Sequence, residues 1–355
     1  MKNNEIHVKH EKLTNDIYIS ENMLPSRYVL VLTNLCNLRC SFCFQEKKSS
    51  PNSMSTSEWI NIIKQFPKYS RVTLTGGEPF IFKGFKEVFH EVASNYDCNI
   101  ISNGLPLDRE LIDYLLSYNR FKTLSISVDT VRNINRNVKP KDWDKLMDVL
   151  NYFIQKRKEI NSDCKLDIKT TVLDDNINDL FEIHKYCIEE LHADFHSYQL
   201  LKGSPIQHAD IEYTFDSIFQ KSKAHVYENF HILKEQLDLV KDYNCNHLKT
   251  GFLHPKVTSL LENTNVDYTY INNQEYNKNL FKTCKFPWSS IHINHDGKVF
   301  PCLAVNMGNV KDMPLTDIIF GEKFMKFKET IHKCGTVEAC NRCGWLKPLY
   351  KVEDN

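Results

Sequence analysis

The hydrophobic pattern of the chain switches repeatedly between two periods. Apolar runs rich in β-branched residues predict strands near residues 28–35, 71–75, 98–102, 121–128, 165–172 and 194–201. Stretches with apolar residues every three or four positions predict helices near 58–63, 84–95, 108–118, 142–159 and 176–190. These strand–helix units with short connections favour an α/β fold, in which a parallel sheet curls into a partial (β/α)6 TIM-like barrel with the helices outside.

The chain is less regular on both sides of these units. Residues 1–24 form a polar N-terminal extension, in which residues 17–19 suggest an edge strand. Residues 215–240 predict one long helix that closes the barrel, so the barrel domain is expected to span 25–240. Residues 241–283 show no clear period and are interpreted as a connector.

The pattern changes again at residue 284. Apolar positions alternate over 291–300 around an Asp-Gly pair, which predicts a β-hairpin. A helix is expected near 315–331. Residues 284–355 are therefore predicted to form a small C-terminal domain built from a hairpin and a helix.

The composition is that of an ordinary globular protein. Of the 355 residues, 41% are hydrophobic and 25% are charged, which is enough for one large domain and a smaller one. Lys+Arg and Asp+Glu both number 45, so nothing indicates binding to nucleic acid or to an acidic membrane surface. No apolar run reaches the length of a membrane span and the polar start is no signal peptide, so we expect a cytoplasmic protein.

The twelve cysteines are grouped, and this adds metal chemistry to the picture. Disulfide scaffolds of this kind occur in short secreted chains, whereas groups of cysteines in a reducing compartment indicate metal. One triplet lies near the N-terminus and a second group lies beyond residue 283. The four single cysteines are interpreted as core residues: Cys98, Cys164, Cys187 and Cys245.

The N-terminal triplet has the spacing of an iron–sulfur site. Cys36, Cys40 and Cys43 form a C-x3-C-x2-C run directly after the first predicted strand. Three thiolates so close in sequence suit three irons of a [4Fe–4S] cluster and leave the fourth iron with an open position. A zinc site would normally need a fourth protein ligand close by.

Short polar segments follow the next three strands. They are Thr75–Pro79 (Thr-Gly-Gly-Glu-Pro), Ser102–Gly104 and Ser125–Asp129. In barrels of parallel strands the chemistry lies at the C-terminal ends of the strands. We therefore expect these segments to converge with the cysteine loop on one mouth.

Together these motifs resemble the radical S-adenosylmethionine (radical SAM) superfamily. The triplet is similar to the family's signature, residues 75–79 to its GGEP motif, and the other two segments to those that hold the methionine and ribose parts of the cofactor. The resemblance spans roughly residues 25 to 200 and implies that the three cysteines are the catalytic cluster ligands. The residues it implies for S-adenosylmethionine binding are Phe42, Gly76, Gly77, Glu78, Pro79, Ser102, Asn103, Ser127, Asp129 and Arg136.

Some residues near the mouth carry a more specific expectation. Glu78 is interpreted as a local scaffold carboxylate rather than an acid catalyst. Arg136, like Arg132, is a candidate for binding the carboxylate of the cofactor. Four residues on the fifth and sixth strands are expected to point into the barrel, where they line a substrate pocket or form a plain interior: Lys169, Thr170, His196 and Gln199.

The C-terminal cysteines resemble the SPASM/twitch extensions of that superfamily. Cys284 and Cys302 flank the predicted hairpin, and Cys340 and Cys343 form a C-x2-C pair. The full SPASM pattern has further cysteines and two clusters, but this chain has none after Cys343. The resemblance therefore implies one auxiliary [4Fe–4S] cluster on these four residues, with Cys334 left over. A structural zinc is the alternative.

The resemblance implies an enzyme that reductively cleaves S-adenosylmethionine to a 5′-deoxyadenosyl radical and abstracts hydrogen from a substrate. We expect a peptide or protein substrate that is oxidised, cross-linked or epimerised, and a one-electron donor such as flavodoxin or ferredoxin. Only the extension 1–24 precedes the barrel, which leaves no room for the leader-binding domain of many peptide-modifying relatives. The alternatives are dehydrogenation or epimerisation of a small molecule such as an aminocyclitol, and a non-catalytic metal-binding scaffold.

Overall fold

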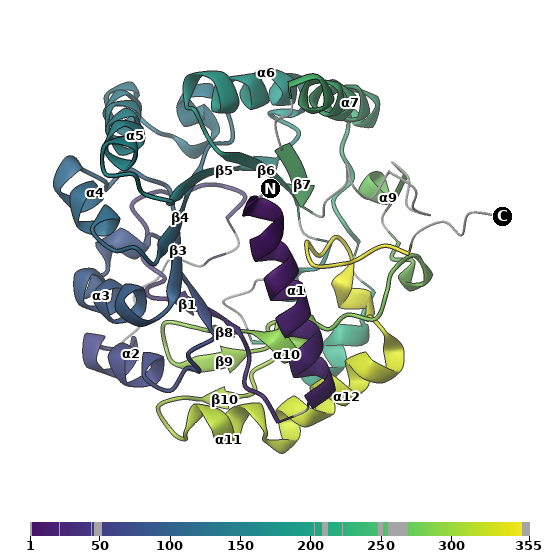
Figure 1. Cartoon of the computed structure of the whole chain (residues 1–355). Coiled ribbons are helices and arrows are strands. Elements are labelled where there is room, and N and C mark those ends of the chain that lie inside the picture. The colour runs from purple at the N-terminus through teal and green to yellow at the C-terminus, as the bar shows by residue number, and fades with distance from the viewer. Residues whose placement is uncertain are drawn as a thin grey trace.

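A single curved sheet of ten strands lies at the centre of the molecule, with helices wrapped around its outer side (Figure 1). The order across the sheet is β10-β9-β8-β1-β2-β3-β4-β5-β6-β7. This computed structural model describes residues 2–20, 22–43, 45, 52–201, 203–207, 212–221, 223–247, 251–254, 269–273 and 275–349.

Strands β1 to β7 pair in parallel and in sequence order, as the barrel prediction requires. Their bounds are β1 Arg27–Val31, β2 Arg71–Thr75, β3 Asp97–Ser102, β4 Phe121–Ser127, β5 Lys165–Val172, β6 Phe195–Leu200 and β7 Gly251–His254. The predicted α/β class with a partial barrel is confirmed. The first six of these strands match the predicted ones, and β7 adds a further parallel strand inside the stretch expected to be a connector.

Helices follow the strands and cover the outer face of the sheet (Figure 1). They are α2 Thr56–Ile63, α3 Phe85–Asn95, α4 Arg109–Leu116, α5 Pro140–Glu159, α6 Leu180–Lys185 and α7 Phe230–His247. Helix α2 begins with a capping box. The Ser55 hydroxyl accepts from Glu58 N at 3.3 Å, and the Glu58 carboxylate accepts from Ser55 N at 2.7 Å.

The long helix expected over 215–240 is wrong at both ends. A short 3-10 helix covers Phe215–Phe219, and the α-helix begins only at Phe230 and continues to His247. Tyr227, three residues before this start, is held by contacts with other segments. Tyr227 N donates to Asn272 Oδ1 at 2.7 Å, and its hydroxyl donates to Val172 O at 3.1 Å.

The N-terminal extension forms helix α1 (Lys2–Ser20), so the edge strand expected at residues 17–19 is wrong. Ile17 is 1% exposed, whereas Ile19 is 75% exposed, as a helix with one buried face requires. The Tyr18 ring packs edge-on against Trp288 with centroids 4.8 Å apart, and its hydroxyl lies 2.6 Å from His332 Nδ1. Helix α1 is thereby joined to the C-terminal part of the chain, and in Figure 1 it crosses the opening enclosed by the sheet.

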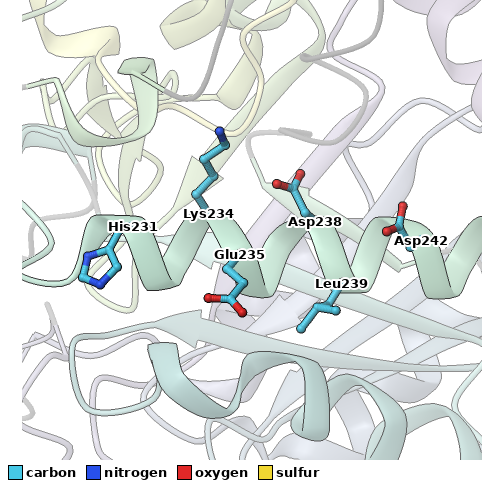
Figure 2. A pocket seen from close by; sticks show the side chains of 6 residues that line it. All are labelled: His231, Lys234, Glu235, Asp238, Leu239 and Asp242. Atoms are coloured by element: carbon cyan, nitrogen blue, oxygen red, sulfur yellow. The ribbon is translucent and has the colours of Figure 1, made fainter.

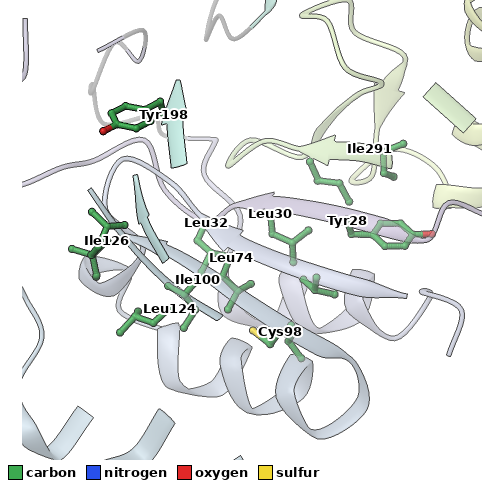
Figure 3. Close-up of a cluster of buried hydrophobic side chains, with 14 of the residues drawn as sticks. Tyr28, Leu30, Leu32, Leu74, Cys98, Ile100, Leu124, Ile126, Tyr198 and Ile291 are labelled. Atoms are coloured by element: carbon green, nitrogen blue, oxygen red, sulfur yellow. The ribbon is translucent and has the colours of Figure 1, made fainter. Parts of the chain in front are cut away.

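The core lies between the sheet and the outer helices. Alternate strand residues point outward and are fully buried there, among them Leu30, Leu74, Ile100 and Ile126 at 0% exposure (Figure 3). Each such side chain stabilises the fold by roughly 1.5–3 kcal/mol. The opposite face of the same strands is mostly polar, with Val29, Val31 and Ile101 among the apolar exceptions, and it forms the inside of the barrel.

The C-terminal region joins the same sheet. Strand β8 (Ser290–Ile293) pairs in parallel with β1, β9 (Lys298–Phe300) pairs antiparallel with β8, and β10 (Gly308–Asn309) ends the sheet. The predicted hairpin is thus confirmed, with Gly297 in its turn at φ +87°. The helices here are α9 Thr269–Asn272, α10 Phe286–Ser289, α11 Leu315–Ile319 and α12 Glu322–Cys334. None of the helices described is long and apolar enough to cross a membrane.

Candidate functional site

The three-cysteine loop follows β1 and receives hydrogen bonds on its sulfurs. Cys36, Cys40 and Cys43 are all half-buried. Leu38 N donates to Cys36 Sγ at 3.4 Å, and Asn103 Nδ2, which comes from the end of β3, lies 3.8 Å from the same sulfur. Donors aimed at sulfur are the arrangement that stabilises thiolates and tunes the iron they bind.

The glycine pair after β2 lies directly against the start of this loop. Gly77 N donates to Thr33 O at 2.6 Å and Glu78 N donates to Leu35 O at 2.8 Å. A Cβ at Gly76 would lie 2.6 Å from Thr33 O, and a Cβ at Gly77 would overlap Leu35 O. Only glycine therefore allows the two loops to approach so closely.

Glu78 is the internal support of the mouth. Its side chain is 0% exposed and accepts three hydrogen bonds, from Ser102 Oγ at 2.8 Å, Asn103 N at 2.9 Å and Phe80 N at 3.2 Å. Burial raises its pKa to about 7, against the lowering effect of these donors. The carboxylate thus joins the ends of β2 and β3, which is the scaffold role expected of it. Pro79 begins the 3-10 helix that follows.

Asp129 and Arg136 form a buried pair beyond β4. Arg136 Nε donates to Asp129 Oδ2 at 2.5 Å, and the other carboxylate oxygen accepts from Thr171 N at 2.6 Å. Arg136 also reaches the cluster loop, because its Nη1 lies 3.8 Å from Cys40 Sγ and its Cζ lies 5.2 Å from the centre of the Phe42 ring. Both groups are already engaged by the protein, so their predicted contacts with S-adenosylmethionine stay predictions.

The loop after β4 is held by two asparagines that sequence patterns did not single out. Asn133 has φ +49°, and its side chain bonds Asp129 N at 2.8 Å and Ser127 O at 2.9 Å. Asn176, 0% exposed, donates to Asp129 O and to Thr171 O, both at 2.8 Å. Asparagine tolerates this left-handed conformation better than most residues, which is the only signal the sequence offered.

A polar cluster lies inside the barrel on β4, β5 and β6. Asp167 accepts from Ser125 Oγ and Ser197 Oγ, both at 2.9 Å, and Lys169 Nζ lies 2.7 Å from its Oδ2. The Lys169 side chain is 29% exposed, and Gln199, on the same face of β6, is exposed. This part of the barrel interior is therefore open and carries a cation.

The expectation that all four residues on β5 and β6 share this face is wrong. Successive strand residues point to opposite faces, so Thr170 and His196 point outward when Lys169 and Gln199 point inward. His196 is 0% exposed, its Nε2 lies 2.8 Å from Thr170 Oγ1, and its Nδ1 lies 2.9 Å from His184 Nδ1. Burial lowers the pKa of His196 well below its usual value, so its imidazole is neutral. Thr170 and His196 therefore belong to a hydrogen-bond network in the core, outside the barrel interior.

The C-terminal cysteines come together from two segments. Cys284 N donates to Gly335 O at 2.9 Å, and Cys343 N donates to Cys340 O at 2.9 Å. Burial raises the pKa of the Cys340 thiol, and the nearby Cys343 and Cys284 raise it further. Cys302 follows β9 and is half-buried against the same core. Cys334, at the end of α12, is exposed.

Within the described parts of the chain, no group of three or more His, Cys, Asp or Glu side chains is close enough to hold a single metal ion. A four-iron cluster needs wider spacing than a zinc ion, because each thiolate binds a different iron. Both cysteine groups offer thiols, and backbone N–H groups donate to Cys36 Sγ and to Cys340 Sγ. This donor chemistry fits such clusters.

A shallow pocket on the surface of α7 is separate from these sites. It is lined by His231, Lys234, Glu235, Asp238, Leu239 and Asp242, all from that one helix (Figure 2). Its lining contains no cysteine and none of the residues predicted for the site, so we assign it no role.

Comparison with known proteins agrees with this geometry. Residues 30–187 match the radical SAM superfamily, and residues 284–344 match an iron–sulfur cluster-binding domain of SPASM type. Residues 30–187 thus form a radical SAM domain, and residues 284–344 form a SPASM-type region. These two domains imply a [4Fe–4S] cluster with S-adenosylmethionine at the first site and an iron–sulfur cluster at the second.

Among curated proteins, the chain is 37% identical over 117 residues to the sporulation killing factor maturation protein SkfB of Bacillus subtilis, covering 32% of this chain and 28% of SkfB. It is 27% identical over 124 residues to the subtilosin biosynthesis protein AlbA of the same organism, covering 32% and 26%. It is 28% identical over 155 residues to GTP 3′,8-cyclase of Clostridium perfringens, covering 41% and 46%. The chain thus spans less than half the length of these relatives.

Solved structures share the fold over nearly the whole chain. Streptococcus suis SuiB bound to its precursor peptide SuiA superposes with a TM-score of 0.63 at 16% identity, covering 95% of this chain and 75% of SuiB. The enzyme anSMEcpe with bound AdoMet and a peptide superposes with a TM-score of 0.59 at 16% identity, covering 93% and 92%. At these identities the likeness shows the fold alone.

Proposed function

We propose that the chain is a radical SAM enzyme that reductively cleaves S-adenosylmethionine and abstracts a hydrogen atom from a peptide or protein substrate. The observation that carries this proposal is the convergence, at the ends of β1 to β4, of the cysteine loop with Gly77, Asn103 and Arg136. A [4Fe–4S] cluster held by these cysteines would supply the one electron that splits S-adenosylmethionine into methionine and a 5′-deoxyadenosyl radical.

The chain's own residues orient the reactants and shape the space around them. Cys36, Cys40 and Cys43 would hold the cluster. Gly76 and Gly77 keep the mouth narrow enough for backbone groups to reach the methionine part, while Glu78 keeps the ends of β2 and β3 at fixed spacing.

A peptide or protein substrate is favoured by the relatives. SkfB is named for the maturation of a sporulation killing factor, AlbA is named for the biosynthesis of a bacteriocin, and SuiB was solved with a precursor peptide. We place the substrate over β5 and β6, where Lys169 and Gln199 face the open interior. Oxidation, cross-linking and epimerisation remain the proposed outcomes, with flavodoxin or ferredoxin as electron donor in the reducing cytoplasm.

Anaerobic reconstitution tests the proposal. Protein incubated with S-adenosylmethionine and dithionite should release 5′-deoxyadenosine, and the triple variant C36A/C40A/C43A should release none. Iron should fall from about eight to about four atoms per chain in that variant if both sites hold a four-iron cluster. Absence of 5′-deoxyadenosine from the iron-loaded wild type would leave only a metal-binding scaffold.

The substrate class needs a separate comparison. Peptides encoded beside the gene and small aminocyclitols would be incubated with the reconstituted protein, and product masses compared. Loss of two mass units, a new cross-link, or an inverted residue detected by chiral analysis of the hydrolysed peptide would support the proposal. Turnover of the small molecule alone would replace it.

A further inference from the structure

Arg342 carries a buried guanidinium that has no hydrogen-bond partner among the described residues. It lies between Cys340 and Cys343, and the whole residue is 2% exposed. Its Nε, Nη1 and Nη2 atoms are all buried, and none has a hydrogen-bond partner in the part of the chain that the structure describes. No other charged side chain of these residues has all of its nitrogens in this state.

Such an arrangement is costly unless an anion is close. A guanidinium presents five N–H donors and does not lose its proton in a protein. Burying a donor without an acceptor is unfavourable, and more so where the group is charged. A folded protein retains such a residue when something else neutralises it.

The described neighbours of Arg342 do not supply that negative charge. Its Cζ lies 5.8 Å from the centre of the Tyr227 ring, and its backbone N–H donates to the Tyr270 hydroxyl at 3.0 Å. Burial raises the pKa of both phenols, so both are neutral at physiological pH. No carboxylate forms an ion pair with Arg342 among the residues that the structure covers.

The loop around Arg342 holds the side chain inward. Arg342 has φ +56°, in the left-handed region that few side chains adopt. Gln207 Nε2 donates to Ala339 O at 2.6 Å and also to Asn341 O, and a Cβ at Gly203 would overlap Asn341 O. The turn is thus held from the barrel side by its backbone, and the guanidinium is buried in this position.

We propose that Arg342 is the internal counter-charge of the iron–sulfur cluster held by the C-terminal cysteines, and that it raises the reduction potential of that cluster. A cluster bound by thiolates is an anion, and reduction adds a further negative charge next to the guanidinium. A fixed cation in a medium of low dielectric therefore favours the reduced form. Arg342 lies between two of the cluster cysteines and is buried from solvent. Both facts favour an anion that is bound permanently in the protein over one that enters from solution.

The test uses a chain that carries only this cluster. On the C36A/C40A/C43A background, the potential of the remaining cluster is measured by redox titration followed by electron paramagnetic resonance. We expect R342M to move the midpoint to more negative values, with at least a tenfold lower ratio of reduced to oxidised cluster at a fixed potential, or ~59 mV for one electron. R342K should keep most of the parental value, and R109M, at an exposed arginine of α4, should not change it.

Iron content decides between an electrostatic and a merely structural role. The proposal requires R342M to keep the parental iron content while the midpoint moves. If R342M does not accumulate as folded protein, R342Q (neutral) and R342K (charged) are compared instead. The proposal would be overturned if R342M lost its iron and R342K lost it as well. It would also be overturned if the C36A/C40A/C43A protein bound no iron.

An unchanged midpoint at full iron content would also overturn it, because the guanidinium would then have no electrostatic effect on the cluster. The background cannot produce 5′-deoxyadenosine, so the result does not depend on whether the proposed radical function is correct. The two proposals therefore fail separately.

Discussion

At the scale of single residues, the site is defined by close backbone approach more than by reactive side chains. Gly77 shows this most clearly, because its N–H donates to Thr33 O and a Cβ at this position would overlap Leu35 O. The glycine pair could be predicted from the motif alone. Its actual contact, the segment just before Cys36, could not, because sequence patterns do not show which loops touch.

Gly77→Ala should disrupt this contact. The added methyl would overlap Leu35 O, which belongs to the backbone and cannot rotate away. We expect a loss of about 1–3 kcal/mol in the free energy of unfolding, as for other overpacked sites, and a loss of iron from the first cluster. Chemical denaturation and iron analysis measure the two effects. Ser57→Ala, at an exposed position of α2, is the control. Unchanged stability with full iron would contradict the contact.

Glu78 makes stability depend on pH in an unusual direction. Its pKa is raised to about 7 in the folded protein, so the folded state binds the proton more tightly than the unfolded state. This contribution is complete below about pH 4.5 and is lost as pH rises through 7. The unfolding free energy should fall over that window by about 3 kcal/mol, from ~1.4 kcal/mol per pKa unit.

Glu78→Gln should remove this pH dependence. It should also cost about 1–3 kcal/mol at low pH, because the amide group would face a backbone N–H donor. Urea titrations at several pH values compare it with Glu87→Gln, an exposed position on α3. Equal slopes for wild type and Glu78→Gln would show that another group carries the effect.

At the scale of elements, the hydrophobic pattern predicted the strands and helices that local sequence determines. It missed those that depend on contacts between distant segments. Strands β1 to β6 and the hairpin were predicted because their apolar positions alternate between turn residues. Helix α1 was not, because its charged sequence has only one buried face, built on residues such as Ile17. The side-by-side pairing of β8 with β1 joins residues far apart in sequence and leaves no local trace.

A proline in α1 tests whether this element is a docked helix. Lys12 is exposed, so Lys12→Ala should leave stability nearly unchanged. Lys12→Pro removes a helical hydrogen bond and clashes with the preceding turn, which costs about 3 kcal/mol or more. Thermal unfolding of the two variants measures the difference. Equal midpoints would mean that α1 does not contribute its packing on Trp288 in solution.

At the scale of the whole molecule, the two cysteine sites belong to one sheet. Strand β1 leads directly into the loop of Cys36, and β8, which follows Cys284, covers the edge of that same strand. Arg27 reinforces the junction, because its guanidinium donates to Ser290 Oγ at 3.1 Å and lies 5.1 Å from the centre of the Trp345 ring. A boundary at residue 284 thus separates sequence motifs but cuts through a continuous sheet.

A chain ending at residue 283 should therefore fail to form the first site. Without β8, the N–H and C=O groups of β1 become an open edge that attracts other chains, and the anchor of the Cys36 loop is lost. The full-length variant C284A/C340A/C343A is the matched control, because it removes the second site but keeps β8. We expect this control to stay monomeric and to retain about four irons, whereas the truncated chain aggregates or binds none. Size-exclusion chromatography with iron analysis separates the two. A truncated chain that is monomeric and holds its cluster would show that the barrel folds without β8.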